Sequence, residues 1–133
     1  MRYMLDTNIC IYIAKQNPPR VMARFSQLSP DEVAMSVVTY GELRFGAEKS
    51  SRSAAAIRSL NAFVEAVPVL SLDPDVGSNY GRLRLDLERR GQPIGNNDLW
   101  IASHCLQLGL TLVTNNEREF SRIPNLSIEN WTH

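Results

Sequence analysis

The chain of 133 residues has few of the side chains on which thiol or histidine chemistry depends. Its two cysteines, Cys10 and Cys105, lie far apart and form no CxxC or Cys/His cluster. We expect both to be buried free thiols in a reducing compartment, where they contribute packing rather than chemistry. The only histidines are His104 and His133, so we do not expect a nuclease mechanism based on a histidine pair. We interpret His104 as a hydrogen-bonded, partly buried side chain.

Long apolar runs and net charge are also missing. No segment approaches the roughly 18 consecutive apolar residues that indicate a membrane span. Charges at Arg2 and Asp6 fall where a signal peptide would be apolar, so we expect a cytoplasmic protein. The 14 basic and 14 acidic side chains cancel, which leaves no overall positive field to attract a polyanion. Twelve of the bases are arginine, whose planar group matches phosphate and carboxylate geometry.

The length suits one domain spanning residues 1–133, and strand-like and helix-like segments alternate along it, which is typical of α/β proteins. Crossover connections of this length favour parallel neighbours. We therefore expect a central, mostly parallel, five-stranded sheet flanked by helices on both faces, with Pro68 placing the third strand at an edge. The expected strands are 2–5, 33–38, 67–72, 110–114 and 126–128, and the expected helices are 9–13, 21–28, 39–48, 54–66, 76–90, 98–108 and a short one after 116.

Three carboxylates lie at or near junctions between an apolar, strand-like segment and a helix-like one. Asp6 follows the first strand, Glu42 lies about a turn into the helix after the second, and Asp98 opens a later apolar helix. In an open α/β sheet, ligands bind beyond the carboxyl ends of the parallel strands. The sequence therefore predicts that these three acids meet in one place.

Gathered carboxylates repel one another and raise each other's pKa, so a fold that keeps them ionised needs a cation. An oxygen-only ligand set favours a hard ion, Mg²⁺ with Mn²⁺ as a substitute, over zinc. Such ions bridge to substrate phosphate and activate water, which points to hydrolysis of a phosphate ester.

Four segments of the chain form a recognisable series of motifs. They are Met4–Ile9, Ser36–Leu43 with Gly46 and Ala47 after it, Ile94–Ala102 and Leu112–Phe120. In this order they resemble the successive motifs of a PIN-domain ribonuclease and are most similar to the VapC toxins of bacterial toxin–antitoxin pairs. The resemblance covers nearly the whole chain.

The resemblance implies a three-layer PIN-like domain that acts as a Mg²⁺-dependent endoribonuclease on structured RNA, commonly tRNA, and so arrests translation. We expect metal-activated water to attack phosphorus in line and leave a 5′-phosphate and a 3′-hydroxyl. It also implies a homodimer that is neutralised by a cognate VapB-type antitoxin, whose arginine or hydrophobic segment enters the acidic groove.

By the same resemblance, Asp6, Glu42 and Asp98 are the catalytic, metal-binding acids. Many relatives carry an aspartate where this chain has Asn116, and Glu119 is the alternative source of a fourth carboxylate. We expect one tightly held ion, with a second arriving with substrate. The residues expected to orient the acids or a bound water are Thr7, Asn8, Ser36, Thr39 and Thr114.

Each feature also has a purely structural interpretation. Asp6 and Asp98 are both well placed to cap helices, and Glu42 could be a solvated helix residue. A helix carries Arg82, Arg84, Arg89 and Arg90, which form either an RNA-binding face or a solvated face paired with acids of the same helix, Asp86 and Glu88. Trp100 continues an apolar segment, so we expect it to pack rather than to stack on bases.

Two other functions compete with the ribonuclease. In a Mg²⁺-dependent phosphatase or phospho-receiver domain, Asp6 would be the nucleophile or a magnesium ligand. The phosphatases need a second aspartate where this chain has Asn8, and no lysine follows the last strong strand as a receiver requires. In a non-catalytic binding module, the acidic pocket would only receive an arginine from a partner.

Overall fold

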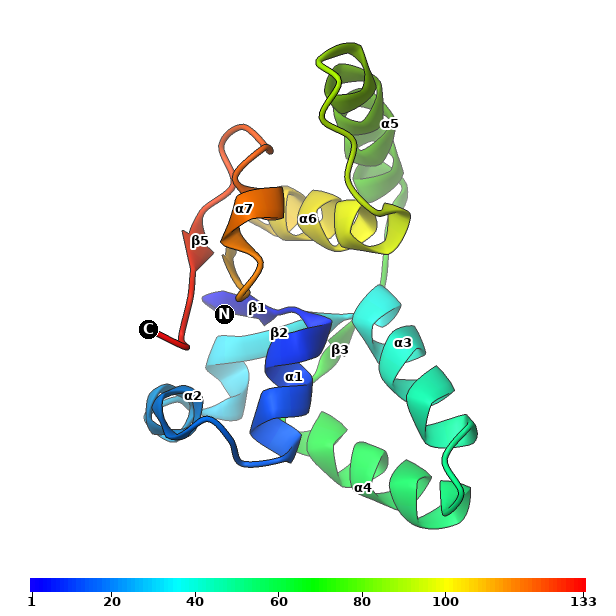
Figure 1. Ribbon diagram of the computed structural model, residues 1–133, viewed down its shortest axis with the longest axis vertical. Helices are drawn as coiled ribbons and strands as arrows, with labels where there is room; N and C mark the ends of the chain where they lie inside the picture. The colour runs from blue at the N-terminus through cyan, green and yellow to red at the C-terminus, as the bar shows by residue number, and fades with distance from the viewer.

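The computed structural model describes all residues from 1 to 133 and has a five-stranded sheet at its centre (Figure 1). The strand order is β3-β2-β1-β4-β5, and every neighbouring pair is parallel. The expected α/β class is confirmed, with a wholly parallel sheet. The strands are β1 (Tyr3–Leu5), β2 (Val33–Ser36), β3 (Val69–Leu70), β4 (Thr111–Val113) and β5 (Ile128–Glu129).

Seven α-helices and one short 3-10 helix connect the strands. Helices α1, α2 and α4 lie on one side of the sheet and α5, α6 and α7 on the other (Figure 1). None of the helices combines the length and apolar character that a bilayer crossing requires. The helices are α1 (Thr7–Ala14), α2 (Pro19–Phe25), η1 (Pro30–Glu32), α3 (Val37–Glu48), α4 (Ser53–Ala66), α5 (Pro74–Arg89), α6 (Asn96–Leu108) and α7 (Glu117–Phe120).

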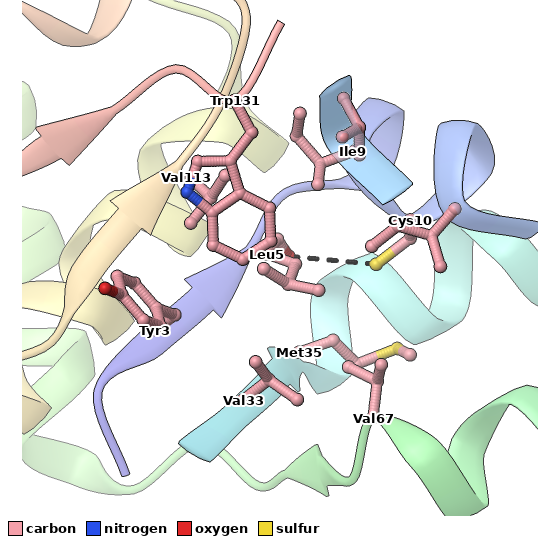
Figure 2. Close-up of a cluster of buried hydrophobic side chains, with 11 residues drawn as sticks. Tyr3, Leu5, Ile9, Cys10, Val33, Met35, Val67, Val113 and Trp131 are labelled. Atoms are coloured by element: carbon pink, nitrogen blue, oxygen red, sulfur yellow. Dashed lines mark hydrogen bonds between the residues drawn. The ribbon is translucent and has the colours of Figure 1, made fainter. Parts of the chain in front are cut away.

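Alternation along the strands builds a core on each face of the sheet. Tyr3 and Leu5 point into the core shared with α1 and α2, while Met4 between them points into the core under α6. In the first core, Trp131 meets the Tyr3 ring edge-on, with centroids 5.4 Å apart (Figure 2). The chain's last residues are thereby tied to the central strand.

Both cysteines are buried free thiols, as expected. The Cys10 thiol points back toward the Leu5 carbonyl, at 4.0 Å (Figure 2). Burial raises the pKa of Cys10 far above its usual range and that of Cys105 to about 12. Neither forms a thiolate near neutral pH, so both act as small apolar side chains.

The boundaries of two predicted strands were wrong. The second strand ends at Ser36, because the Ser36 hydroxyl accepts the Val38 N–H at 3.1 Å and starts α3 there. Val37 and Val38 are therefore helical in spite of their β-branched side chains. The third strand shrinks to two residues, since Pro68 has no N–H to donate, and it lies at the sheet edge as predicted.

The central strand should carry much of the stability. Leu5 is fully buried in β1, whereas Leu85 on α5 is 50% exposed. We expect Leu5→Ala to lower the free energy of unfolding by about 2–5 kcal/mol, because it loses buried surface and leaves a cavity. Leu85→Ala is the matched control and should change it by less than about 0.5 kcal/mol. Urea unfolding followed by tryptophan fluorescence measures both, and equal effects would contradict this account of the core.

Candidate active site

The three predicted acids meet at the carboxyl end of the sheet. Helices α1, α3 and α6 all begin on this side (Figure 1). Asp6 follows β1, Glu42 lies in the second turn of α3, and Asp98 lies in the first turn of α6. They share a pocket of about 130 Å³, and its lining residues are Asp6, Thr7, Asn8, Glu42, Asp98, Asn116 and Phe120.

Asp6 both caps a helix and lines the pocket. Its side chain is 5% exposed, and Oδ1 accepts the Ile9 N–H at 2.9 Å. Burial raises its pKa, and so does the Glu42 carboxylate, while the Thr114 hydroxyl and the backbone N–H of Ile9 lower it. The capping interpretation is therefore correct, but it does not exclude a place in the acidic pocket.

Glu42 is oriented from the neighbouring helix α1. The Thr7 hydroxyl donates to Glu42 Oε1 at 2.5 Å and lies 3.5 Å from the Thr39 hydroxyl. On the other side, the Asn97 amide approaches Glu42 Oε2 at 3.5 Å. Glu42 is thus half-buried and hydrogen-bonded rather than a freely solvated helix residue. The sequence analysis predicted no role for Asn97 at the site, although this residue directly precedes the predicted metal ligand Asp98.

Asp98 lies beside the fourth acidic candidate. Glu119 Oε1 accepts the Gly95 N–H at 3.0 Å, and its Oε2 accepts the Asn116 amide at 2.6 Å. Burial raises the pKa of Asp98 to about 7, helped by the carboxylates of Glu119, Asp6 and Glu42. The cap of α6 is Gly95, so the capping interpretation of Asp98 was wrong.

Asn116 and Glu119 take different places at the fourth position. Asn116 lines the pocket, and its backbone N–H donates to the Thr114 hydroxyl at 2.9 Å. Glu119 reaches the same region through its contact with the Asn116 amide. No three Asp, Glu, His or Cys side chains are close enough together to form a ready-made metal cage. The acids Asp6, Glu42 and Asp98 instead line the walls of a common pocket.

The residues expected to orient the acids fall into two groups. Thr7, Asn8, Thr39 and Thr114 lie in or beside the acidic pocket. Ser36 does not contact an acid: its hydroxyl accepts the Val38 N–H and bonds to His104 Nδ1 at 2.9 Å. The prediction that Ser36 orients Glu42 directly was therefore wrong, because its hydroxyl bonds to the Val38 N–H and to His104 instead.

The predicted RNA-binding arginines, three on α5 and Arg90 directly after it, do not line the acidic pocket. Arg84 pairs with Glu88 at 2.8 Å and Arg90 with Asp86 at 2.9 Å, both on exposed helix surface. Figure 1 shows α5 rising away from the sheet. The paired, solvated interpretation is therefore confirmed for Arg84 and Arg90. An RNA contact by Arg82, Arg84, Arg89 or Arg90 stays a prediction.

Trp100 packs within the protein, as expected. Its ring stacks on Tyr80 with centroids 3.9 Å apart and an angle of 10° between the planes. Tyr80 belongs to α5 and Trp100 to α6, so the stack joins these two helices. Trp131 is 2% exposed and lies in the core beside Tyr3, so it is not free to stack on a base.

Asp98 should make metal-free stability depend on pH. Its pKa of about 7 in the folded protein exceeds the ordinary value of 3.8, so the folded state holds the proton more tightly than the unfolded state. Stability is therefore lost as pH rises from about 4 to about 7. We expect Asp98→Asn, which mimics the protonated acid, to raise the free energy of unfolding at pH 8 by about 1–2 kcal/mol, discounted for partial solvent access. Urea unfolding in EDTA at pH 5 and pH 8 measures it, and a large destabilisation would mean that Asp98 is a structural anchor.

Comparison with known proteins agrees with this geometry. The family model for the PIN domain matches residues 3–126. Ribonuclease VapC1 of Haemophilus influenzae strain R2866 is 45% identical over 133 residues, covering 99% of both chains. A tRNA(fMet)-specific endonuclease VapC of Shigella flexneri is 40% identical over 132 residues, again covering 99% of both.

Comparison of the fold with solved structures identifies the same group of proteins. The structure of VapBC-1 from nontypeable Haemophilus influenzae superimposes with a TM-score of 0.92 at 44% identity, covering all of both chains. The match extends over every strand and helix that borders the acidic pocket. The resemblance noted in the sequence is thus confirmed, and the chain belongs to the PIN-domain family and, within it, to the VapC ribonucleases.

Proposed function

We propose that this protein is the toxin of a toxin–antitoxin pair, a Mg²⁺-dependent endoribonuclease that cleaves structured RNA, with tRNA as the substrate, in the cytoplasm. We further propose that residues 1–133 act as one PIN domain. The observation that carries the proposal is the pocket shared by Asp6, Glu42 and Asp98 in a chain of the VapC ribonucleases. The tRNA assignment follows the Shigella flexneri relative.

The donor set fits a hard divalent cation. Ribonucleases of this family are generally metal-dependent. The pocket offers carboxylate, amide and hydroxyl oxygens and no thiol or imidazole, which favours Mg²⁺ or Mn²⁺. Burial raises the pKa of Asp98, and the nearby carboxylates of Glu119, Asp6 and Glu42 raise it further; a cation would offset this negative charge. Mg²⁺ usually keeps several of its waters, so acids that surround a space without closing on it can still bind it.

Two of the three acids are held by hydrogen bonds. Ile9 and Thr114 hold Asp6 and Thr7 holds Glu42, while Asp98 projects from the first turn of α6. When bound, Mg²⁺ lowers the pKa of water and stabilises negative charge on the phosphate. In our proposal Asp6, Glu42 and Asp98 hold the ion, and the carboxylates accept the proton of the attacking water. No side chain serves as a nucleophile, so the expected products carry a 5′-phosphate and a 3′-hydroxyl.

The proposed protein partners are inferred from the relatives. The Haemophilus influenzae neighbour was solved as VapBC-1. We propose that a VapB-type antitoxin inhibits this protein by placing an arginine or an apolar segment in the acidic groove, where the carboxylates would pair with the cation. We also propose that the protein forms a homodimer.

RNA cleavage in vitro tests the proposal. The purified, antitoxin-free protein should cleave tRNA with Mg²⁺, lose this activity in EDTA and recover it when Mg²⁺ is restored. Asp98→Asn should lower kcat on the order of 10²–10⁴-fold, because an ionisable group at the reaction centre is removed. Asp86→Asn, an exposed acid on α5, is the control and should be unchanged. Cleavage that survives EDTA would overturn the mechanism.

The residue at the fourth acidic position should determine how many metal ions the pocket binds. Asn116 lines the pocket but brings no charge, so we expect the wild-type protein to bind one Mn²⁺ tightly in the absence of RNA. Asn116→Asp adds a carboxylate and should allow a second Mn²⁺ to bind. Calorimetric titration measures the stoichiometry, with Asn115→Asp as a control outside the pocket lining. Two ions bound by the wild type would show that Glu119 already supplies the fourth carboxylate.

A further inference from the structure

His104 is buried between the two helices that carry Glu42 and Asp98. It lies on α6, six residues after Asp98, and is 1% exposed. Its Nδ1 is 2.9 Å from the hydroxyl of Ser36, the last residue of β2 and the cap of α3. The Ser36 oxygen also accepts the Val38 N–H at 3.1 Å. A short chain of hydrogen bonds therefore runs from α6 to the first turn of α3.

Helix α3 is held from two sides. On the α1 side, Thr7 bonds directly to Glu42. On the α6 side there are two side-chain hydrogen bonds, Asn97 to Glu42 at 3.5 Å and His104 to Ser36 at 2.9 Å. The Asn97 contact is long and exposed, whereas the His104 contact is short and buried. The buried bond is thus the stronger constraint on the relative position of α3 and α6.

We propose that His104 is a positioning residue that, through Ser36, fixes Glu42 on α3 relative to Asp98 on α6. The inference rests on the proposed function, because it matters only if these two acids act on the same cation. His104 itself does not line the acidic pocket, so it is neither a ligand nor a catalytic residue. Residues that hydrogen-bond to metal ligands set ligand orientation and affinity, and His104 would act one step farther out, through the cap of the helix that carries Glu42.

The ring is suited to this role in its neutral form. Burial lowers the pKa of His104, partly opposed by the Asp73 carboxylate and the Ser71 carbonyl. A neutral imidazole accepts a hydrogen bond at one nitrogen and donates at the other. With Nδ1 as acceptor, the Ser36 hydroxyl donates to His104 while its oxygen accepts from Val38, so both hydrogen bonds are satisfied together. The ring N–H is then free for the Ser71 carbonyl.

A pair of polar substitutions tests the inference. His104→Asn places an amide oxygen near the Nδ1 position and keeps an acceptor for Ser36. His104→Gln places its amide farther out, toward Ser71, and loses that acceptor. The control is Ser103→Ala, since the buried Ser103 hydroxyl bonds only to the Leu99 carbonyl within α6, at 2.7 Å. All are measured by Mn²⁺ titration of the purified chain, by kcat and KM for RNA cleavage, and by thermal melting.

We expect His104→Gln to weaken Mn²⁺ binding about 10–100-fold and to lower kcat with little change in KM. His104→Asn should stay within about 3-fold of the wild type, and Ser103→Ala should leave Mn²⁺ affinity unchanged even if it lowers the melting temperature. Should the Gln variant not fold, restored folding and Mn²⁺ binding in the Asn variant would still support the role of the Ser36 bond.

Two results would overturn the inference: unchanged Mn²⁺ affinity in a folded His104→Gln, or equal losses in the Asn and Gln variants. Failure of the proposed function looks different. If the wild-type chain binds Mn²⁺ but does not cleave RNA, the ribonuclease proposal falls, while the Mn²⁺ affinities still decide the role of His104. A wild-type chain that binds no Mn²⁺ would refute both.

Discussion

Repulsion between carboxylates is the constraint on which this structure depends. Asp6, Glu42 and Asp98 share one pocket, and Glu119 adds a fourth negative group that raises the pKa of Asp98. Three of these four charges accept a hydrogen bond: Asp6 from the Ile9 N–H, Glu42 from the Thr7 hydroxyl, and Glu119 from the Gly95 N–H. The protein thus holds an unfavourable charge arrangement with hydrogen-bond donors, and our proposal of a cation site rests on this arrangement.

The parallel sheet makes that arrangement possible. Its parallel strands all end on the same side of the sheet, and the central strands β1, β2 and β4 lie between two buried cores. Separating these strand ends would therefore expose a core. Buried hydroxyls at two strand ends, Ser36 and Thr114, link this frame to the site. Thr114 reaches Asp6 and Asn116, and Ser36 joins α3 to His104. The site is therefore supported by polar contacts that begin in the core.

Much of the fold could be predicted because its signals are local. The apolar run from Tyr3 to Leu5, the edge proline Pro68 and the helix end at Gly109, whose φ is 67°, are all visible in short stretches of sequence. The predictions failed where a specific contact outweighed the local conformational preference of a residue. Val37 and Val38 favour a strand by residue type, but the Ser36 cap turns them into a helix. Asp98 has the residue type of a cap, yet α6 begins at Gly95 and leaves its carboxylate in the pocket.

The sequence by itself determined the α/β class, the place of each acid at a strand-to-helix junction and the family, because these depend on residue type and order along the chain. Only the tertiary structure decided which groups meet. It placed Asn116 in the pocket lining and Glu119 beside Asp98, paired the arginines Arg84 and Arg90 with acids on α5, and turned Ser36 toward His104 rather than toward Glu42. The reason is physical: hydrogen bonds and charge repulsion act over a few ångströms, whereas the residues they join lie far apart in the sequence, as Ser36 and His104 do at a separation of 68 positions.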